Sequence, residues 1–338
     1  MYLGVDGGGT KTAFSLLDAD GVVVAERQAP SMYYFAEGIG LVERVLRDGV
    51  DEVCAAAGIT PDAIAHAFVG IPCYGEVSAD VPELDAIPAR VLGSDRYACG
   101  NDMVCGWAGS LGGGDGINVV SGTGSIAYGE RGGASWRAGG WGELFGDEGS
   151  GYWVAIQGLN AFSRMGDGRL PAGPLMETVR EALDLRADLD VVDIVLNRWH
   201  GDRAKIAAVS RAVGAAADRG DAASLEILRA AGRELAALVD VIADALGFPD
   251  GEDVPVSYSG GMFTSPQVLA SFTEHVAAGP RSYDLRAPLL PPHVGAALYA
   301  ARLAGHRFDA DQLARLQHAA DAVPAVPAVP AVPAVPAP

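Results

Sequence analysis

Basic residues are scarce in this chain of 338 residues, because 24 Lys and Arg stand against 43 Asp and Glu and give a formal charge of -19. A surface this acidic repels phosphate backbones and anionic lipids, so we expect neither nucleic-acid binding nor membrane binding. No uncharged apolar run approaches the roughly 18 residues of a membrane-spanning helix. An anionic small substrate would need a local site of backbone N–H groups, a metal ion or both.

Cysteine is equally scarce, and the chain has only Cys54, Cys73, Cys99 and Cys105. None forms a Cys-x-x-Cys pair, which excludes a disulfide scaffold or zinc knuckle and is typical of a reducing compartment. The six histidines form no ligand-like cluster. The first residues lack a basic segment followed by an apolar stretch, so no signal peptide is visible. We therefore expect a cytoplasmic protein.

Apolar residues are plentiful, at 49% against 20% charged, and the length allows two ordinary domains. The end of the chain differs in composition, since residues 322–338 repeat Ala-Val-Pro. Proline at every third position forbids a helix and favours an extended chain. We expect a disordered tail over residues 320–338, outside the fold.

The hydrophobic pattern predicts one order of elements twice: strand, strand, strand, helix, strand, helix. The expected strands are 2–5, 13–17, 21–25, 65–71, 89–92, 117–121, 125–130, 135–138, 254–258 and 283–286. The expected helices are 38–58, several within 150–247, 266–278 and 294–303. Two α/β units joined near residues 105–116 imply a cleft between them, where small-molecule sites commonly lie.

A glycine-rich hairpin is expected in each unit. Residues 6–12 read Asp-Gly-Gly-Gly-Thr-Lys-Thr, and residues 121–125 read Ser-Gly-Thr-Gly-Ser. Glycines let the backbone approach a phosphate, and the threonine hydroxyls add donors. Either hairpin alone is explained as well by an ordinary turn. One after the first strand of each unit favours nucleotide binding, with Asp6 able to hold Mg²⁺ directly or through water.

Three further segments have suitable chemistry. Residues 257–262 end a strand in Gly-Gly, which exposes backbone for adenine or ribose. Residues 139–150 combine glycines, Trp141 and two carboxylates, the components of a sugar site, although Asp147 or Ser150 also fits a helix N-cap. Asp102 follows a strand end and suits a general base for a hydroxyl, although such a residue is more often a cap.

Together, residues 6–10, 121–125 and 139–150 resemble the N-acetylglucosamine kinase branch of the BadF/BadG/BcrA/BcrD ATPase family, within the actin, hexokinase and Hsp70 superfamily. The resemblance spans residues 2–305 and includes residues 259–262 and 291–297. It implies an α/β fold of two ribonuclease H-like domains with an interdomain cleft for ATP and sugar. The implied domains are residues 1–112, completed by a helix at about 293–305, and residues 113–292 with inserted helices.

The same resemblance implies phosphoryl transfer from ATP, with Mg²⁺, to the 6-hydroxyl of an amino sugar such as N-acetylglucosamine or glucosamine. Asp102 would be the catalytic base and Asp6 would hold the Mg²⁺ shell. The implied nucleotide-binding residues are Gly8, Gly9, Thr10, Lys11, Gly122, Thr123, Gly124, Ala207, Gly260 and Gly261. The implied substrate-binding residues are Asp102, Gly140, Trp141, Gly142, Asp147, Ser31 and Met32. Family members are often dimers, so a homodimer is an open expectation.

One position departs from the family pattern. Family kinases usually carry Asn in the loop after the third strand, where its amide binds the sugar, and Met32 stands there in this chain. Methionine cannot make those hydrogen bonds. Either Ser31 or a neighbouring tyrosine replaces the Asn, or the acceptor is another sugar, such as free glucosamine or a muramic acid derivative.

Three alternatives stay open from the sequence. An activator ATPase of the same family would need an iron–sulfur cluster, and the scattered cysteines speak against it. A sugar or nucleotide sensor without catalysis is a second alternative, although Asp6, Asp102 and both threonine hairpins are present. A kinase of the ROK type would carry a cysteine-rich zinc motif, which this sequence lacks.

Overall fold

The computed structural model describes residues 1–322, so most of the expected tail lies outside the described residues. Residues 320–322 end helix α12 (Ala310–Ala322), and the expected start of the tail at residue 320 is therefore wrong. Asp309 and Gln312 start this helix with reciprocal bonds, in which each side-chain oxygen accepts from the other's backbone N–H at 2.8 and 2.9 Å. Leu316 is buried against the fold and holds the helix in place.

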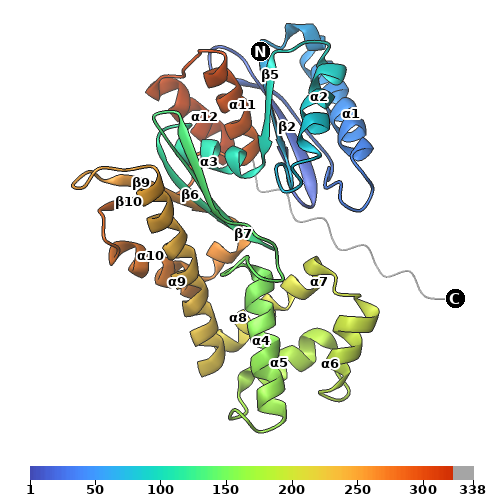
Figure 1. The fold of residues 1–338 in the computed structure, drawn as a ribbon, viewed down its shortest axis with the longest axis vertical. Coiled ribbons are helices and arrows are strands. Elements are labelled where there is room, and N and C mark those ends of the chain that lie inside the picture. Colours follow the sequence, from blue (N-terminus) through green and yellow to red (C-terminus); the bar gives the residue numbers. More distant parts are fainter. Residues whose placement is uncertain (323–338) are drawn as a thin grey trace, which may run out of the picture.

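Two five-stranded mixed sheets form the centres of two domains (Figure 1). The first sheet has the order β3-β2-β1-β4-β5, and the second has the equivalent order β8-β7-β6-β9-β10. In each sheet the first strand of the unit pairs antiparallel with the second and parallel with the fourth. The structure confirms the predicted α/β fold with one topology used twice.

The strands of the first sheet are β1 (Tyr2–Gly7), β2 (Lys11–Leu17), β3 (Val23–Pro30), β4 (His66–Ile71) and β5 (Tyr97–Asn101). The helices of this part are α1 (Gly40–Ala57), the short 3₁₀ turn η1 (Pro61–Ala63), α2 (Val81–Leu92) and α3 (Met103–Leu111). The predicted strand at 89–92 is wrong, because those residues form the last turn of α2. A short apolar run of this length fits a buried strand and a helix equally well.

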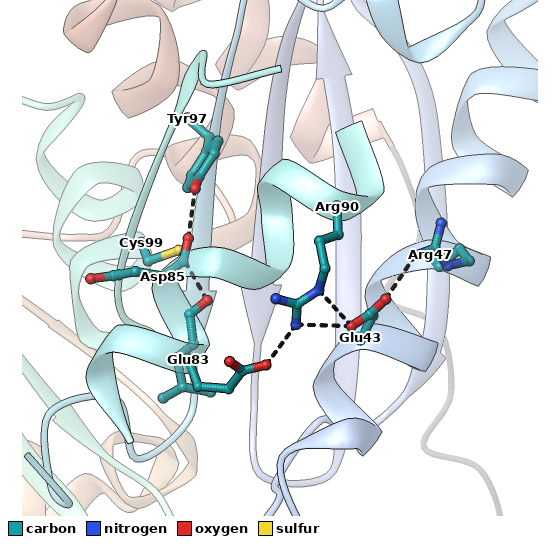
Figure 2. A network of polar contacts seen from close by, with 8 residues as sticks. Glu43, Arg47, Glu83, Asp85, Arg90, Tyr97 and Cys99 are labelled. Atoms are coloured by element: carbon teal, nitrogen blue, oxygen red, sulfur yellow. Dashed lines mark hydrogen bonds and ion pairs between the residues drawn. The ribbon is translucent and has the colours of Figure 1, made fainter. Parts of the chain in front are cut away.

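A polar network on the outer face joins α1 to α2 (Figure 2). Arg90 of α2 donates to Glu43 of α1 at 3.0 Å and to Glu83 at 2.7 Å, and Arg47 also donates to Glu43. Beside it, the Tyr97 hydroxyl donates to the Asp85 carbonyl at 2.6 Å and ties β5 to α2. The ion pairs are exposed, so they orient the helices more than they stabilise them.

The second domain has the strands β6 (Gly116–Ser121), β7 (Ser125–Arg131), β8 (Ala134–Gly139), β9 (Val254–Ser259) and β10 (Tyr283–Arg286). Between β8 and β9 lie α4 (Gly151–Gly166), α5 (Pro174–Leu183), α6 (Asp190–Val192), the π-helical η2 (Asp193–Arg198), α7 (Arg203–Ala208), α8 (Ser210–Asp218) and α9 (Ala222–Ala245). The 3₁₀ turn η3 (Gly261–Thr264) and α10 (Pro266–Ala277) follow β9. Helices α4 to α8 form the lower end of the molecule in Figure 1.

Helix α11 (Pro292–Leu303) packs on β1, β2, β4 and α3 of the first domain. Two glycines allow the close approach. A Cβ on Gly4 of β1 would stand 2.1 Å from the Ala297 nitrogen, and one on Gly295 would stand 2.1 Å from the Gly109 nitrogen of α3. The backbones therefore touch at both crossings. Within residues 1–322, no helix is both long and apolar enough to cross a membrane.

Candidate active site

The carboxyl ends of three parallel strands bring Asp6 and Asp102 to one edge of the first sheet. Asp6 on β1 is level with Gly70 on β4, and Gly70 is level with Gly100 on β5, two residues before Asp102. Gly70 is packed closely against α3 between them, with no room for a side chain. A Cβ there would stand 2.4 Å from the Cys105 sulfur and 3.2 Å from the Asp102 Cα.

The environment raises the pKa of both carboxyl groups. Burial raises the pKa of Asp6 from 3.8 to about 6, against the lowering effects of His293 and Lys11. Burial also raises the pKa of Asp102, to about 7, and the negative charge of Asp6 adds to the rise. A carboxylate with a pKa near 7 is suited to accept a proton at neutral pH.

The first glycine hairpin exposes its tip. Gly9, Thr10 and Lys11 are solvent-exposed, and a Cβ on Gly9 would meet no atom within 4 Å. A Cβ on Gly8 would come only to 3.2 Å of the Lys11 carbonyl. Gly9 therefore has no packing reason to be glycine, whereas a ligand that approaches the backbone would provide one.

The loop after β3 gives different roles to its neighbouring residues. The Ser31 hydroxyl donates to the Gly8 carbonyl at 2.9 Å and accepts from the Tyr33 N–H, so it joins this loop to the first hairpin. Met32 is fully buried in the hydrophobic core of the first domain, and in this conformation it offers no surface to a ligand. Of Ser31, Met32 and Tyr33, only Tyr33 has an exposed side chain.

The second hairpin is clamped to the start of α4. The Ser121 and Ser125 hydroxyls donate to the carbonyls of Gly149 and Glu148 at 3.0 and 2.7 Å. The Gly151 N–H donates to the Gly122 carbonyl at 2.8 Å. Ser150 caps α4, as predicted for one of two candidates. A Cβ on Gly122 would meet nothing within 4 Å, so this glycine, like Gly9, lines open space.

The loop between β8 and α4 carries the expected sugar-side residues. Trp141 is exposed, and Gly140 and Gly142 have the positive φ angles of 68° and 89° that favour glycine. Asp147 is only 2% exposed, and its Oδ2 accepts from Nη2 of Arg203 at 2.5 Å. Burial raises the pKa of Asp147, and Arg203 lowers it. Asp147 therefore acts in this conformation as a tie between the loop and α7.

The remaining nucleotide candidates lie around the second hairpin. Gly260 has a φ of 101°, and a Cβ there would stand 2.3 Å from the Ser121 carbonyl oxygen, so it has a packing role. Gly261 is exposed and meets nothing within 4 Å. Ala207 is buried in α7, which packs against α4.

At the junction of the two domains, the charge of Arg203 in the second domain affects the pKa of two residues in the first. Burial raises the pKa of the Cys73 thiol, Glu76 adds to the rise, and Arg203 opposes it. Tyr33 is influenced in the same way, since burial raises its pKa and the Arg203 charge lowers it. Tyr33 of the β3–α1 loop and Cys73 of the β4–α2 loop therefore lie within electrostatic range of Arg203.

Two acidic side chains, Asp6 and Asp102, lie near each other at this junction. Among residues 1–322, no three His, Cys, Asp or Glu side chains converge on a single metal position. Mg²⁺ in phosphoryl-transfer sites is commonly bound through one or two carboxylates and the substrate phosphates. Asp6 and the neighbouring charge of Asp102 fit that arrangement, because a divalent cation would relieve their repulsion.

A cavity of about 480 Å³ lies elsewhere, between the ends of α3 and α11 and the start of α12. Its lining includes Gly113, Arg302 and Phe308, and none of the candidate residues. The glycine hairpins and the carboxyl groups with raised pKa values lie away from this cavity.

Sequence reasoning missed several residues of this junction. Arg203 is a single arginine at the start of a helix, and nothing in its neighbourhood distinguishes it. Cys73 had a weak signal, since it follows a buried strand between Gly70 and Gly75. Its φ of 64° is uncommon for a residue other than glycine and often marks a functional loop.

Two domains of equal topology, each with a glycine-rich hairpin after its first strand, define the split nucleotidase fold of the actin and hexokinase type. The chain belongs to the BadF/BadG/BcrA/BcrD ATPase family, which it matches over residues 3–300. The family and fold predicted from the sequence are thereby confirmed.

Three relatives illustrate the similarity. The chain is 29% identical over 311 residues to the N-acetyl-D-glucosamine kinase of Dictyostelium discoideum, covering 89% of this chain and 97% of the relative. It is 30% identical over 272 residues to the N-acetylmuramic acid/N-acetylglucosamine kinase of Clostridium acetobutylicum, covering 79% and 87%. A solved structure from Chromobacterium violaceum, provisionally named N-acetylglucosamine kinase, superposes with a TM-score of 0.68 at 27% identity, covering 88% and 98%.

Proposed function

We propose that this protein is an ATP-dependent kinase that phosphorylates the 6-hydroxyl of an amino sugar of the N-acetylglucosamine or glucosamine type. The observation that carries the proposal is Asp102, a half-buried carboxylate beside Asp6, whose pKa is raised by desolvation to about 7. The relatives named N-acetylglucosamine kinase support the acceptor class.

Asp102 is the general base of the proposed reaction. It takes the proton of the acceptor hydroxyl as that oxygen bonds to the γ-phosphorus of ATP. The bond between the γ-phosphorus and the bridging oxygen breaks, and ADP leaves. Such a base contributes on the order of 10²–10⁴-fold to the rate. The raised pKa of Asp102 keeps it basic enough to receive the proton near neutral pH.

The two hairpins bind the nucleotide phosphates through backbone N–H groups and the hydroxyls of Thr10 and Thr123. Gly9, Gly122 and Gly261 support this role, because their backbones face open space and have no steric need for glycine. Bound Mg²⁺ would neutralise phosphate charge, and Asp6 would hold it. Lys11 adds a positive charge near Asp6.

The acceptor lies against the loops at residues 31–35, 73–76 and 140–147 in this proposal. Tyr33, rather than Ser31 or Met32, takes the place of the missing Asn, because Ser31 is committed to Gly8 and Met32 is buried. Trp141 offers an apolar face for the sugar ring. Asp147 keeps this loop in position through Arg203.

The test is ADP release from Mg-ATP in the presence of glucosamine, N-acetylglucosamine, N-acetylmuramic acid and glucose. The proposal expects one of the amino sugars to accelerate release, and Asp102→Asn to abolish the acceleration while nucleotide affinity stays within a few-fold. Acceleration by glucose alone would contradict the acceptor class. Intact ATP binding with no acceleration by any sugar would favour a sensor or an activator ATPase.

A further inference from the structure

Arg203 lies over the second glycine hairpin. It is the first residue of α7, and a Cβ added to Gly124 would stand 2.2 Å from its Nη2 atom. The guanidinium is thus in contact with the backbone that we assign to the nucleotide phosphates. Its position depends on Gly124, because any larger residue would displace it.

Two carboxylates hold the guanidinium from one side. Oδ2 of Asp147 accepts from Nη2, and Oε2 of Glu143 lies 3.5 Å from Nε. Nε is buried, yet it makes no hydrogen bond within the described part of the chain. A guanidinium has five N–H donors, and a buried donor without an acceptor is costly. Glu143 lies within ion-pair distance of Nε but outside hydrogen-bond geometry, so the two carboxylates leave the guanidinium incompletely hydrogen-bonded.

The positive charge also reaches the acceptor side of the junction. Burial raises the pKa values of Tyr33 and Cys73, and the charge of Arg203 lowers both. Arg203 therefore lies within electrostatic range of the first domain while it contacts the hairpin of the second. A phosphoryl group moving from ATP to an acceptor beside Asp102 would pass between these two groups of residues.

We propose that Arg203 is a catalytic residue whose guanidinium binds the oxygens of the phosphoryl group during transfer, with Asp147 as its positioning residue. The inference rests on the proposed kinase function. As the γ-phosphorus leaves the bridging oxygen of ADP and bonds to the sugar oxygen, Asp102 takes the hydroxyl proton and Arg203 faces the charge on the phosphoryl oxygens. A fixed cation aimed at such charge accelerates the step without being consumed.

The variants that test this role are Arg203→Lys and Arg203→Ala. The matched control is Arg198→Ala, since Arg198 pairs with Asp193 on the preceding turn and is 66% exposed. We expect kcat to fall on the order of 10²–10³-fold for Arg203→Ala, while the KM for ATP and the KM for the sugar stay within about threefold of the wild-type values. Millimolar guanidinium should restore part of the activity of this variant, and the control should match the wild type.

A second measurement does not depend on the sugar. MgADP with aluminium fluoride mimics the phosphoryl group in transfer, and its affinity is compared with that of MgADP alone. We expect Arg203→Lys and Arg203→Ala to weaken the aluminium fluoride complex at least tenfold and to leave MgADP binding unchanged. If Arg203→Ala does not fold, Arg203→Lys provides the same comparison.

The outcomes separate the inference from the function on which it rests. An unchanged kcat, or a raised acceptor KM at constant kcat, would reduce Arg203 to an anchor of the loop and overturn the inference. Equal loss of MgADP and aluminium fluoride binding would overturn it as well. A wild type that phosphorylates no sugar, yet binds aluminium fluoride through Arg203, would contradict the kinase function and support the role of Arg203.

Discussion

Glu130 on β7 accepts a hydrogen bond of 2.7 Å from Nη2 of Arg302 on α11, so one ion pair joins the second sheet to the helix that covers the first. Glu130 is 3% exposed, and its other oxygen accepts from the hydroxyls of Tyr128 and Tyr299 at 2.8 and 2.9 Å. Arg302 also donates to the carbonyl of Gly113, in the segment between the domains. The domains are therefore joined by a hydrogen-bonded network around the buried Glu130.

Breaking this network should destabilise the protein. We expect Glu130→Gln and Arg302→Met each to cost roughly 2–4 kcal/mol, below the loss for a fully enclosed pair because Arg302 is 23% exposed. The double variant should lose less than the sum, since each single change leaves an unpaired partner. Urea unfolding measures all three, and Arg90→Met in the exposed network of Figure 2 is the control. Strict additivity would contradict the coupling.

Substitutions at one glycine of each hairpin test nucleotide binding separately from folding. Gly9→Ala and Gly122→Ala add a methyl group into open space, so thermal unfolding should be nearly unchanged. The same methyl group would obstruct a phosphate that contacts the backbone, and we expect a tenfold or greater loss of Mg-ATP affinity. Gly4→Ala is the contrasting variant, because its Cβ would collide with α11 and should impair folding. Unaltered ATP affinity in both hairpin variants would contradict the assignment.

Met32→Asn tests whether the position that departs from the family pattern faces the sugar. Because Met32 is enclosed by the hydrophobic core of the first domain, we expect the polar amide of an asparagine there to lower the free energy of unfolding by roughly 2–4 kcal/mol. Met32→Leu keeps volume and polarity and should cost less than about 1.5 kcal/mol. Chemical denaturation of both variants gives the values. Full stability of Met32→Asn together with faster turnover of N-acetylglucosamine would show that the introduced amide reaches the acceptor.

The high pKa of Asp102 predicts a pH-dependent stability. Because the pKa of Asp102 is higher in the folded than in the unfolded chain, folding favours the protonated carboxyl. The protonated carboxyl therefore stabilises the fold fully below about pH 4, and this stabilisation is lost as the pH rises through about 7. Asp102→Asn carries no charge and escapes this loss. In ligand-free protein, its advantage over wild type should therefore grow by roughly 2–3 kcal/mol between about pH 5 and pH 8.

Urea unfolding at the two pH values measures this advantage. Asp48→Asn, at an exposed position of α1, serves as the control and should show a similar difference from wild type at both pH values. An Asp102→Asn advantage that is the same under both conditions would mean that the carboxyl is better solvated than its burial indicates.

Much of the fold could be predicted from the sequence because two short-range signals repeat. Three short strands with glycine turns and then alternating helices and strands occur in both halves, and the structure uses one topology twice. The prediction failed at residues 89–92, where a short apolar run belongs to a helix begun earlier. It also missed α12, whose few apolar residues, such as Leu316, become meaningful only against the rest of the fold.

The candidate site also contains residues that the sequence could indicate and residues that it could not. Glycine hairpins leave a local signal, so the hairpins and Asp6 could be singled out from the residues themselves. Asp102 could be chosen only through the family resemblance, because the strand before it, β5 (Tyr97–Asn101), was not predicted. Arg203 could not, because its importance comes from contact with Gly124, far away along the chain. The burial of Met32 was equally invisible, since a loop methionine gives no sign of which way it points.

The proposed phosphoryl transfer is tested by single-turnover transfer of the γ-phosphoryl group, with the acceptor oxygen identified by NMR. Wild type and Asp102→Asn are mixed with labelled Mg-ATP and either glucosamine or N-acetylglucosamine. We expect a sugar 6-phosphate with wild type and almost none with Asp102→Asn. Label found only as inorganic phosphate, or equal sugar phosphate from both proteins, would contradict the proposed transfer.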